Sequence, residues 1–135
     1  MSKSGAQYIG YYKKDKFHGL GEYTWVDGTK YIGRFRRGKA NGKGNKFWPL
    51  GGSYTGEFKG GKMSGQGTFS TLDGTVYTGM FKNNKRHGKG TLVFTDGAKF
   101  EGRFFKGLQH GKGVLKSDTG KVIRRGKWAN GKFLA

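Results

Sequence analysis

The chain alternates between short stretches that carry a large apolar residue or glycine at every second place and short polar stretches. One stretch reads aromatic-x-Gly-x-aromatic, as in residues 54–58, and the other reads Gly-x-Gly-x-apolar-x-aromatic, as in residues 88–94. A period of two indicates β-strands whose aromatic and glycine residues share one face. Polar segments such as residues 82–87, and Asp-Gly pairs such as Asp73-Gly74, predict the turns between the strands. No stretch has helical periodicity, so the pattern predicts an all-β protein of consecutive hairpins.

The two kinds of strand recur with a period of 23 residues, counted from an aromatic residue that we call position one. Position one is occupied by Tyr8, Tyr31, Tyr54, Tyr77 and Phe100. The five units have no insertion or deletion and cover residues 8–30, 31–53, 54–76, 77–99 and 100–122. We expect residues 1–7 to be an N-terminal tail, and residues 123–135 to form a partial sixth repeat and a C-terminal cap.

Glycine occupies positions three, twelve, fourteen and twenty-one of all five units, which accounts for 20 of the 28 glycines. Glycine weakens the interior of a strand, so a regular glycine needs a reason. We infer that aromatic rings lie flat against backbone that carries no side chain. In each repeat, one glycine of the first strand and two glycines of the second strand would form the surface beneath the rings. Such a sheet has little second layer. Its stability must come from stacking between neighbouring repeats, as in other solenoids.

Composition agrees with an ordered repeat. A net charge of +19 with 28 glycines in 135 residues would usually indicate disorder, but aromatic residues make up 16% of the chain, and disordered chains are poor in them. The length argues for one domain. The chain has no cysteine and no apolar run of about 18 residues, and residues 1–12 lack the apolar stretch of a signal peptide. We therefore expect a cytoplasmic protein.

The sequence gives no sign of catalysis, and we predict that the protein is not an enzyme. The dinucleotide motif Gly-x-Gly-x-x-Gly, the phosphate-loop motif Gly-Lys-Ser/Thr and the nucleophile motif Gly-x-Ser-x-Gly are all missing. His18, His87 and His110 share position eleven, but neighbouring repeats are about 9.6 Å apart, too far to share one zinc ion. We predict no metal and no cofactor.

The charge is concentrated on one kind of turn. Positions six to thirteen, which we predict to be the hairpin tips, hold 15 basic residues and one acid, Asp15. The turns with the Asp-Gly pairs lie at the opposite edge of a meander and are nearly neutral. The sheet is therefore predicted to carry one basic rim, about 48 Å long, that suits an anionic partner. The residues that we assign to it are Lys13, Lys16, Arg36, Arg37, Lys39, Lys59, Lys62, Lys82, Lys85 and Arg86.

These units resemble the MORN (membrane occupation and recognition nexus) repeat. The best match runs from Tyr77 through Gly79, Phe81 and His87-Gly88-Lys-Gly90 to Asp96-Gly97, and the resemblance covers about residues 8–131. It implies an elongated, twisted antiparallel sheet of hairpins with an aromatic-lined concave groove. It also implies a mostly non-catalytic family whose members hold partner peptides or dimerise, some of them at membranes or anionic phospholipids.

Some positions depart from the family pattern. The second repeat has Asn41 in place of the histidine, and the third has Ser64 there. The fifth repeat carries Phe105 and Leu108 where earlier repeats have lysine or arginine. We expect this C-terminal unit either to present a different surface or to be a cap against Trp128 and Phe133.

Residues and resemblance together predict a binding scaffold whose groove holds a peptide or helix of a partner protein, while the rim contacts anionic phospholipid or acidic partner residues. Two alternatives use the rim alone: a peripheral membrane module that reads phosphoinositides or phosphatidic acid, and a nucleic-acid binder. Exposed strand edges at the ends of a solenoid also permit an end-to-end homodimer. Attachment to a membrane or the cytoskeleton would accompany such roles. The residues that we assign to the groove are Tyr8, Tyr12, Tyr31, Phe35, Tyr54, Phe58, Tyr77, Phe81, Phe100, Phe104, Trp25, Trp48 and Phe94.

Overall fold

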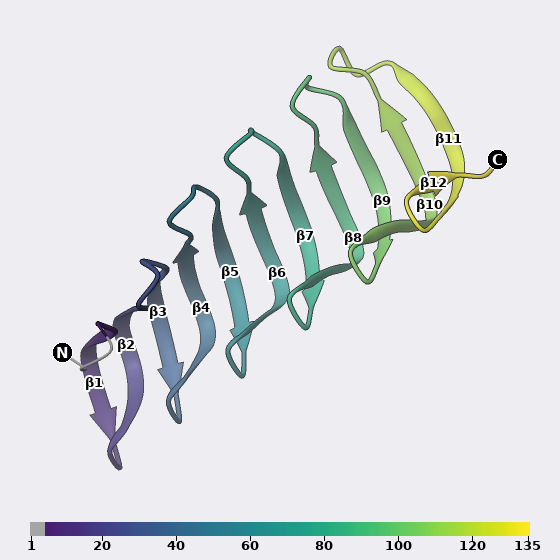
Figure 1. Ribbon diagram of the computed structural model, residues 1–135. Coiled ribbons are helices and arrows are strands. Elements are labelled where there is room, and N and C mark those ends of the chain that lie inside the picture. The colour runs from purple at the N-terminus through teal and green to yellow at the C-terminus, as the bar shows by residue number, and fades with distance from the viewer. Residues whose placement is uncertain (1–4) are drawn as a thin grey trace.

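The computed structural model describes residues 5–135 as one antiparallel sheet of twelve strands, in which each strand pairs with the next along the chain (Figure 1). The sheet does not close into a barrel, so the predicted fold class is confirmed. Residues 1–4 of the predicted tail lie outside the described residues, and Gln7 already belongs to the first strand. The strands are β1 (Gln7–Lys13), β2 (Lys16–Thr24), β3 (Lys30–Arg36), β4 (Lys39–Phe47), β5 (Ser53–Lys59), β6 (Lys62–Ser70), β7 (Val76–Lys82), β8 (Lys85–Val93), β9 (Lys99–Phe105), β10 (Leu108–Lys116), β11 (Val122–Ala129) and β12 (Lys132–Phe133).

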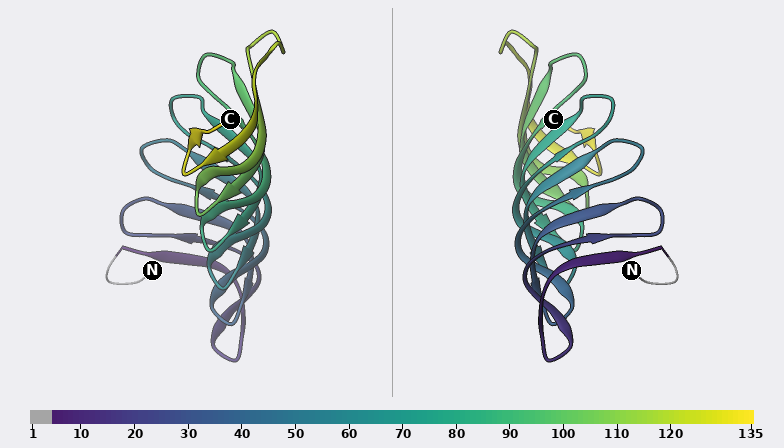
Figure 2. Two further views of the ribbon diagram at one scale, coloured as in Figure 1. Left: turned by 90° about the vertical axis from the view of Figure 1, so that its right-hand side faces the viewer. Right: turned by 90° about the vertical axis from the view of Figure 1, so that its left-hand side faces the viewer.

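The sheet is long and twisted. Figure 2 looks along its length and shows the hairpin loops spread like a fan, because each hairpin is rotated relative to the one before it. Sheets of L-residues twist with a fixed hand, because the chirality of the residues favours one direction of rotation between neighbouring strands. The elongated, twisted sheet that the family resemblance implied is therefore confirmed for the described residues.

The first aromatic ring of each repeat lies on a pair of glycines. Gly33 and Gly44 are cross-strand partners, and the Tyr31 ring covers both. A Cβ atom added to Gly44 would lie 2.6 Å from Cε1 of Tyr31, which no side chain could tolerate. The Tyr31 hydroxyl donates a hydrogen bond of 2.7 Å to the carbonyl of Arg34. Tyr54 and Tyr77 repeat this arrangement, so the predicted packing role of the glycines at positions three and fourteen is confirmed.

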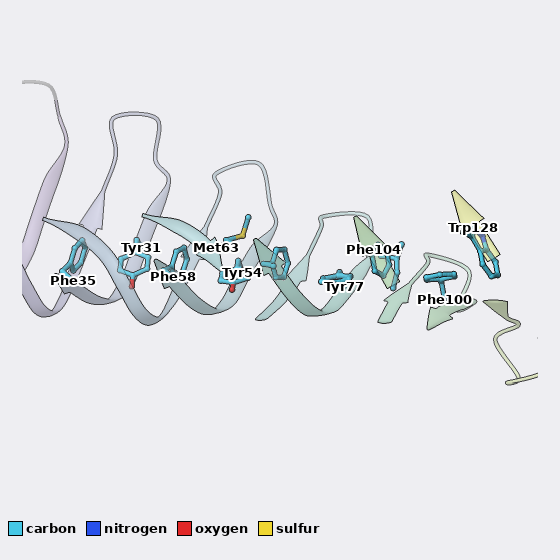
Figure 3. Packing of buried hydrophobic residues seen from close by; sticks show 11 residues of the cluster. Tyr31, Phe35, Tyr54, Phe58, Met63, Tyr77, Phe100, Phe104 and Trp128 are labelled. Carbon is cyan, nitrogen blue, oxygen red and sulfur yellow. The ribbon is translucent and has the colours of Figure 1, made fainter. Parts of the chain in front are cut away.

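The aromatic rings form one continuous row along the sheet. Each ring at position one meets the edge of the ring at position five in its own repeat and in the next. Tyr31, for example, lies 5.0 Å from Phe35 and 4.9 Å from Phe58 between ring centres. Edge-to-face pairs of this kind stabilise by about 0.5–1.5 kcal/mol each beyond the area that they bury. Figure 3 shows the labelled rings in this row, which ends at Trp128, 4.9 Å from Phe100. The row is the hydrophobic core of the protein.

The hairpin tips are shorter than predicted. Each tip is a two-residue turn at positions seven and eight, with positions six and nine already paired, as Lys82 is with Lys85. Asn83 and Asn84 have φ angles of 50° and 70°, which matches the type I′ turn that joins twisted strands. The prediction that positions six to thirteen form the tip was therefore wrong, because the strands continue through most of them.

The glycine at position twelve has a different role from the predicted one. Gly88 has a φ angle of 93°, and residues 87–89 of β8 stand opposite Met80 alone in β7. This is a β-bulge with two extra residues in β8, and it favours glycine for its left-handed backbone. A Cβ atom on Gly88 would only touch Met80, at 3.5 Å, so the floor under the rings does not include position twelve.

Hydrogen bonds close the turns at both edges of the sheet. At the Asp-Gly edge, the Trp25 amide donates to the carbonyl of Thr29, and the Asp27 carboxylate accepts from the Thr29 amide at 2.8 Å. This second hydrogen bond lowers the pKa of Asp27. At the opposite edge, the amide of Gly38 donates to the carbonyl of Phe17, one repeat earlier. The Asp-Gly turns were predicted correctly, and the tips are tied to one another as well as to their own hairpins.

Candidate functional site

The sheet bends across its width, so its two edges face each other over the row of rings. In the fourth repeat, residues from both edges and from the aromatic row line one pocket of about 340 Å³. Its floor includes Tyr77 and Phe81, one wall includes Thr75 at the Asp-Gly edge, and the other includes Asn84 and Gly107 at the tips. We call this concave side of the sheet, above the aromatic row, the aromatic groove.

A second pocket of about 280 Å³ lies in the aromatic groove two repeats earlier. Tyr31, Phe35 and Phe58 form its floor, and Trp25 and Lys46 stand at one side. No aspartate or glutamate lines either of the two groove pockets. The groove therefore offers apolar surface with cations beside it.

The predicted groove residues fall into two groups. The first group is at most 6% exposed and forms the floor; it comprises Tyr31, Phe35, Tyr54, Phe58, Tyr77, Phe81, Phe100 and Phe104. In the second group Tyr12 is 60% and Trp25 38% exposed, while Tyr8, Trp48 and Phe94 are partly buried. Rings that are packed this completely hold the sheet together, so a ligand in the groove would contact mainly the walls.

Sequence reasoning missed two cations inside the aromatic groove. The Lys46 ammonium lies 4.9 Å from the ring centre of Trp25 and 5.4 Å from that of Trp48, and burial lowers its pKa. The Arg86 guanidinium lies 5.2 Å from the ring centre of Phe104 and donates to the carbonyl of Gly107. Both residues occupy repeat positions at which the other repeats have mainly apolar residues. A cation at an otherwise apolar position was the sequence signal that could have placed them in the groove.

Arg86 was therefore wrongly assigned to the basic rim. The other predicted rim residues do lie at the tips, where eight of them form four exposed cross-strand pairs and Arg37 occupies a turn. The pairs are Lys13 with Lys16, Arg36 with Lys39, Lys59 with Lys62, and Lys82 with Lys85. A pocket of about 320 Å³ between the first two tips is lined by Lys13, Lys14, Lys16, His18, Arg36 and Arg37. Its lining contains no acid.

The fifth tip differs from the others. Phe105 and Leu108 are paired across it, and each is 47% exposed. Trp128 packs against Phe100 and, at 4.8 Å between ring centres, against Phe133. The tip thus presents a separate apolar surface, while the fifth unit does pack against the C-terminal Trp128 through Phe100.

Metal and membrane-spanning features are not found in the described chain. Within residues 5–135, no three histidine, aspartate or glutamate side chains come together as metal ligands. The three histidines of position eleven lie along the sheet, and two of them flank Phe105. The same residues contain no helix that is long and apolar enough to cross a membrane.

Comparison with known protein families identifies the repeat. A family model described as the MORN repeat matches residues 8–30, 31–52, 54–76, 77–99 and 100–122. These segments agree with the five predicted units, apart from the last residue of the second. No curated protein sequence matches the chain.

Proposed function

Because the chain belongs to the MORN-repeat family, whose repeats are typically non-catalytic binding modules, we propose that it is a scaffold that holds a segment of a partner protein in its aromatic groove. The observation that carries the proposal is the pair of open apolar pockets along the groove. Pockets of this kind, apolar with a few charged groups, are the usual form of a binding site.

The cations in the aromatic groove indicate the chemistry of the segment. Lys39 and Lys46 line one pocket, Lys85 and Arg86 line the other, and neither lining includes an acid. A segment with apolar anchors and neighbouring carboxylates complements both. The pockets are two repeats apart, which is about 19 Å along the sheet. An extended segment spans that distance with about six residues and a helix with about 13.

Photo-cross-linking from two adjacent residues tests the proposal. Trp48 faces the aromatic groove beside Lys46, whereas Phe47 ends β4 on the other face and is 43% exposed. A benzoylphenylalanine in place of Trp48 is expected to cross-link an acidic, apolar segment of a protein from cell lysate, and one in place of Phe47 is not. Cross-links from Phe47 alone, or to segments without carboxylates, would refute the groove as the binding surface.

A second candidate function rests on the pocket between the first two tips. Five lysine and arginine side chains around one hollow suit the headgroup of an anionic phospholipid, and they favour a peripheral position at the cytoplasmic side of a membrane.

Vesicle flotation separates this candidate from the first. Each basic residue near an anionic surface contributes about 1 kcal/mol, so the double variant Lys13→Gln/Arg36→Gln should bind phosphatidylserine vesicles about 30-fold more weakly. The matched control, Lys82→Gln/Lys85→Gln, removes the same charge at a tip outside the pocket. Equal losses in the two variants, or equal binding to neutral vesicles, would exclude a specific headgroup site.

A further inference from the structure

The face of the sheet opposite the aromatic groove carries a row of cations near its C-terminal end. Lys89 of β8 is paired with Arg103 of β9, and Lys112 of β10 with Lys127 of β11. Arg103 follows Gly102 and Lys112 precedes Gly113, and these two glycines are cross-strand partners in β9 and β10. The four residues therefore cross four neighbouring strands (Figure 1). All four are exposed. We call this set the cation row; it spans about 14 Å.

The one acid that lines a hollow with the cation row is already paired with another lysine. Glu101 is the acid nearest to it on β9, and its carboxylate lies 2.6 Å from the ammonium of Lys116. Earlier on the same face, at equivalent places, Lys43 stands opposite Glu57. Like charges directly opposite each other destabilise a sheet. Two neighbouring pairs of cations therefore favour the binding of an anionic ligand, which would relieve their repulsion.

Aromatic side chains lie beside the cation row. Phe105 of β9 is 47% exposed, with the ring centre of His87 at 5.3 Å on one side and that of His110 at 5.8 Å on the other. These rings come from β8, β9 and β10, the strands that supply Lys89, Arg103 and Lys112. The first four repeats have Lys13, Arg36, Lys59 and Lys82 in the place of Phe105. An exposed ring at position six is therefore particular to the fifth repeat.

We propose that this surface binds single-stranded nucleic acid, with phosphates along the cation row and a base stacked on Phe105. A hollow of about 570 Å³ lies over these strands, and its charged lining is Lys89, Arg103 and Lys112 with one acid, Glu101, which is paired with Lys116. Gln66, Val114, threonines and glycines complete the lining. Cations that follow a phosphate backbone beside aromatic rings that stack bases are the usual design of sequence-tolerant single-strand sites. An acidic peptide or a lipid headgroup would use the cations and leave the ring without a role. The surface is independent of the aromatic groove, because it lies on the other face.

One substitution separates stacking from charge. Phe105→Lys gives the fifth repeat the kind of residue found in the other four, so it removes the ring and adds a positive charge. Base stacking contributes about 1–3 kcal/mol, so the variant should bind labelled oligothymidylate and oligouridylate of about ten nucleotides at least fivefold more weakly in fluorescence anisotropy. Binding by charge alone would become tighter. Unchanged or tighter binding by the variant would overturn the proposal.

A charge-matched pair of variants tests the cation row. Lys89→Gln/Arg103→Gln should weaken binding and lower the slope of log affinity against log salt by about 1.4. Lys59→Gln/Lys82→Gln removes the same charge from the tips and should have little effect at physiological salt. Equal losses would show that the net charge of +19, rather than this surface, attracts the strand. Binding of phosphatidylserine vesicles that Lys89→Gln/Arg103→Gln weakens, with oligonucleotide binding unchanged by the same variant, would assign the row to lipid instead.

Discussion

The substitution Gly90→Ala is expected to cost about 3 kcal/mol or more of folding free energy. Gly90 has no left-handed backbone, so alanine is acceptable there on conformational grounds. Its Cβ atom, however, would lie 2.5 Å from Cζ of Tyr77. Overpacking of a core typically costs 1–3 kcal/mol, and more when the neighbour cannot move.

The Tyr77 ring has no room to move. Its hydroxyl donates to the carbonyl of Met80 at 2.8 Å, and its ring centre lies 5.0 Å from those of Phe81 and Phe104. Displacing it would disturb contacts in two repeats. Because a solenoid is held together by contacts between neighbouring repeats, a break in the middle should lower the denaturation midpoint of the whole sheet, measured by urea unfolding with circular dichroism.

Gly74→Ala is the matched control for this experiment. Gly74 has a φ angle of 95° and no atom within 4 Å of an added Cβ, so alanine there meets only the conformational penalty of about 1–2 kcal/mol. The clash at Gly90 should therefore cost more than the strain at Gly74. If Gly74→Ala proved the more destabilising, the rings would not need the bare backbone beneath them.

Glycine also shows how far the sequence could predict this fold. The period of 23 residues and the alternation within it were enough for the strands, their order and the rings on paired glycines. They did not separate Gly88, which is needed for its left-handed backbone, from Gly90, which is needed for its missing side chain. The two glycines are two residues apart and recur with the same period. Only the bulge between the strands tells them apart.

The candidate site was less predictable because it depends on side-chain direction and on the bend of the sheet. Charge alone placed Arg86 on the rim, although its column holds Phe17, Ala40 and Met63 in the first three repeats. Side chains at that repeat position face the aromatic groove, so the Arg86 side chain does too. The pockets could not be predicted at all, since they form where the two edges of the sheet rise over the rings. No local pattern records that curvature.

Raising the pH from about 10 to about 12 is expected to unfold the protein. Burial raises the pKa of Tyr31, Tyr54 and Tyr77 to about 12, against about 10 in an unfolded chain. The folded state thus favours the neutral phenols. Their contribution to stability is complete below pH 10 and is lost as the pH rises through the folded pKa. A shift of this size corresponds to roughly 3 kcal/mol for each ring, so three rings together approach the stability of a small domain. Tyrosinate absorbance and circular dichroism should change together.

The triple variant Tyr31→Phe/Tyr54→Phe/Tyr77→Phe isolates this effect. The fifth repeat shows that the ring fits without a hydroxyl, because Phe100 is fully buried and covers Gly113 as the tyrosines cover their glycines. At neutral pH the variant should be less stable, since it loses three hydrogen bonds of about 1 kcal/mol each. Between pH 10 and about 12 its stability should fall less steeply than that of the parent. Lysines lose their charge in the same range, but this relieves repulsion in a chain of net charge +19 and so acts in the opposite direction. An equally steep fall in the variant would therefore place the alkaline transition outside the aromatic row.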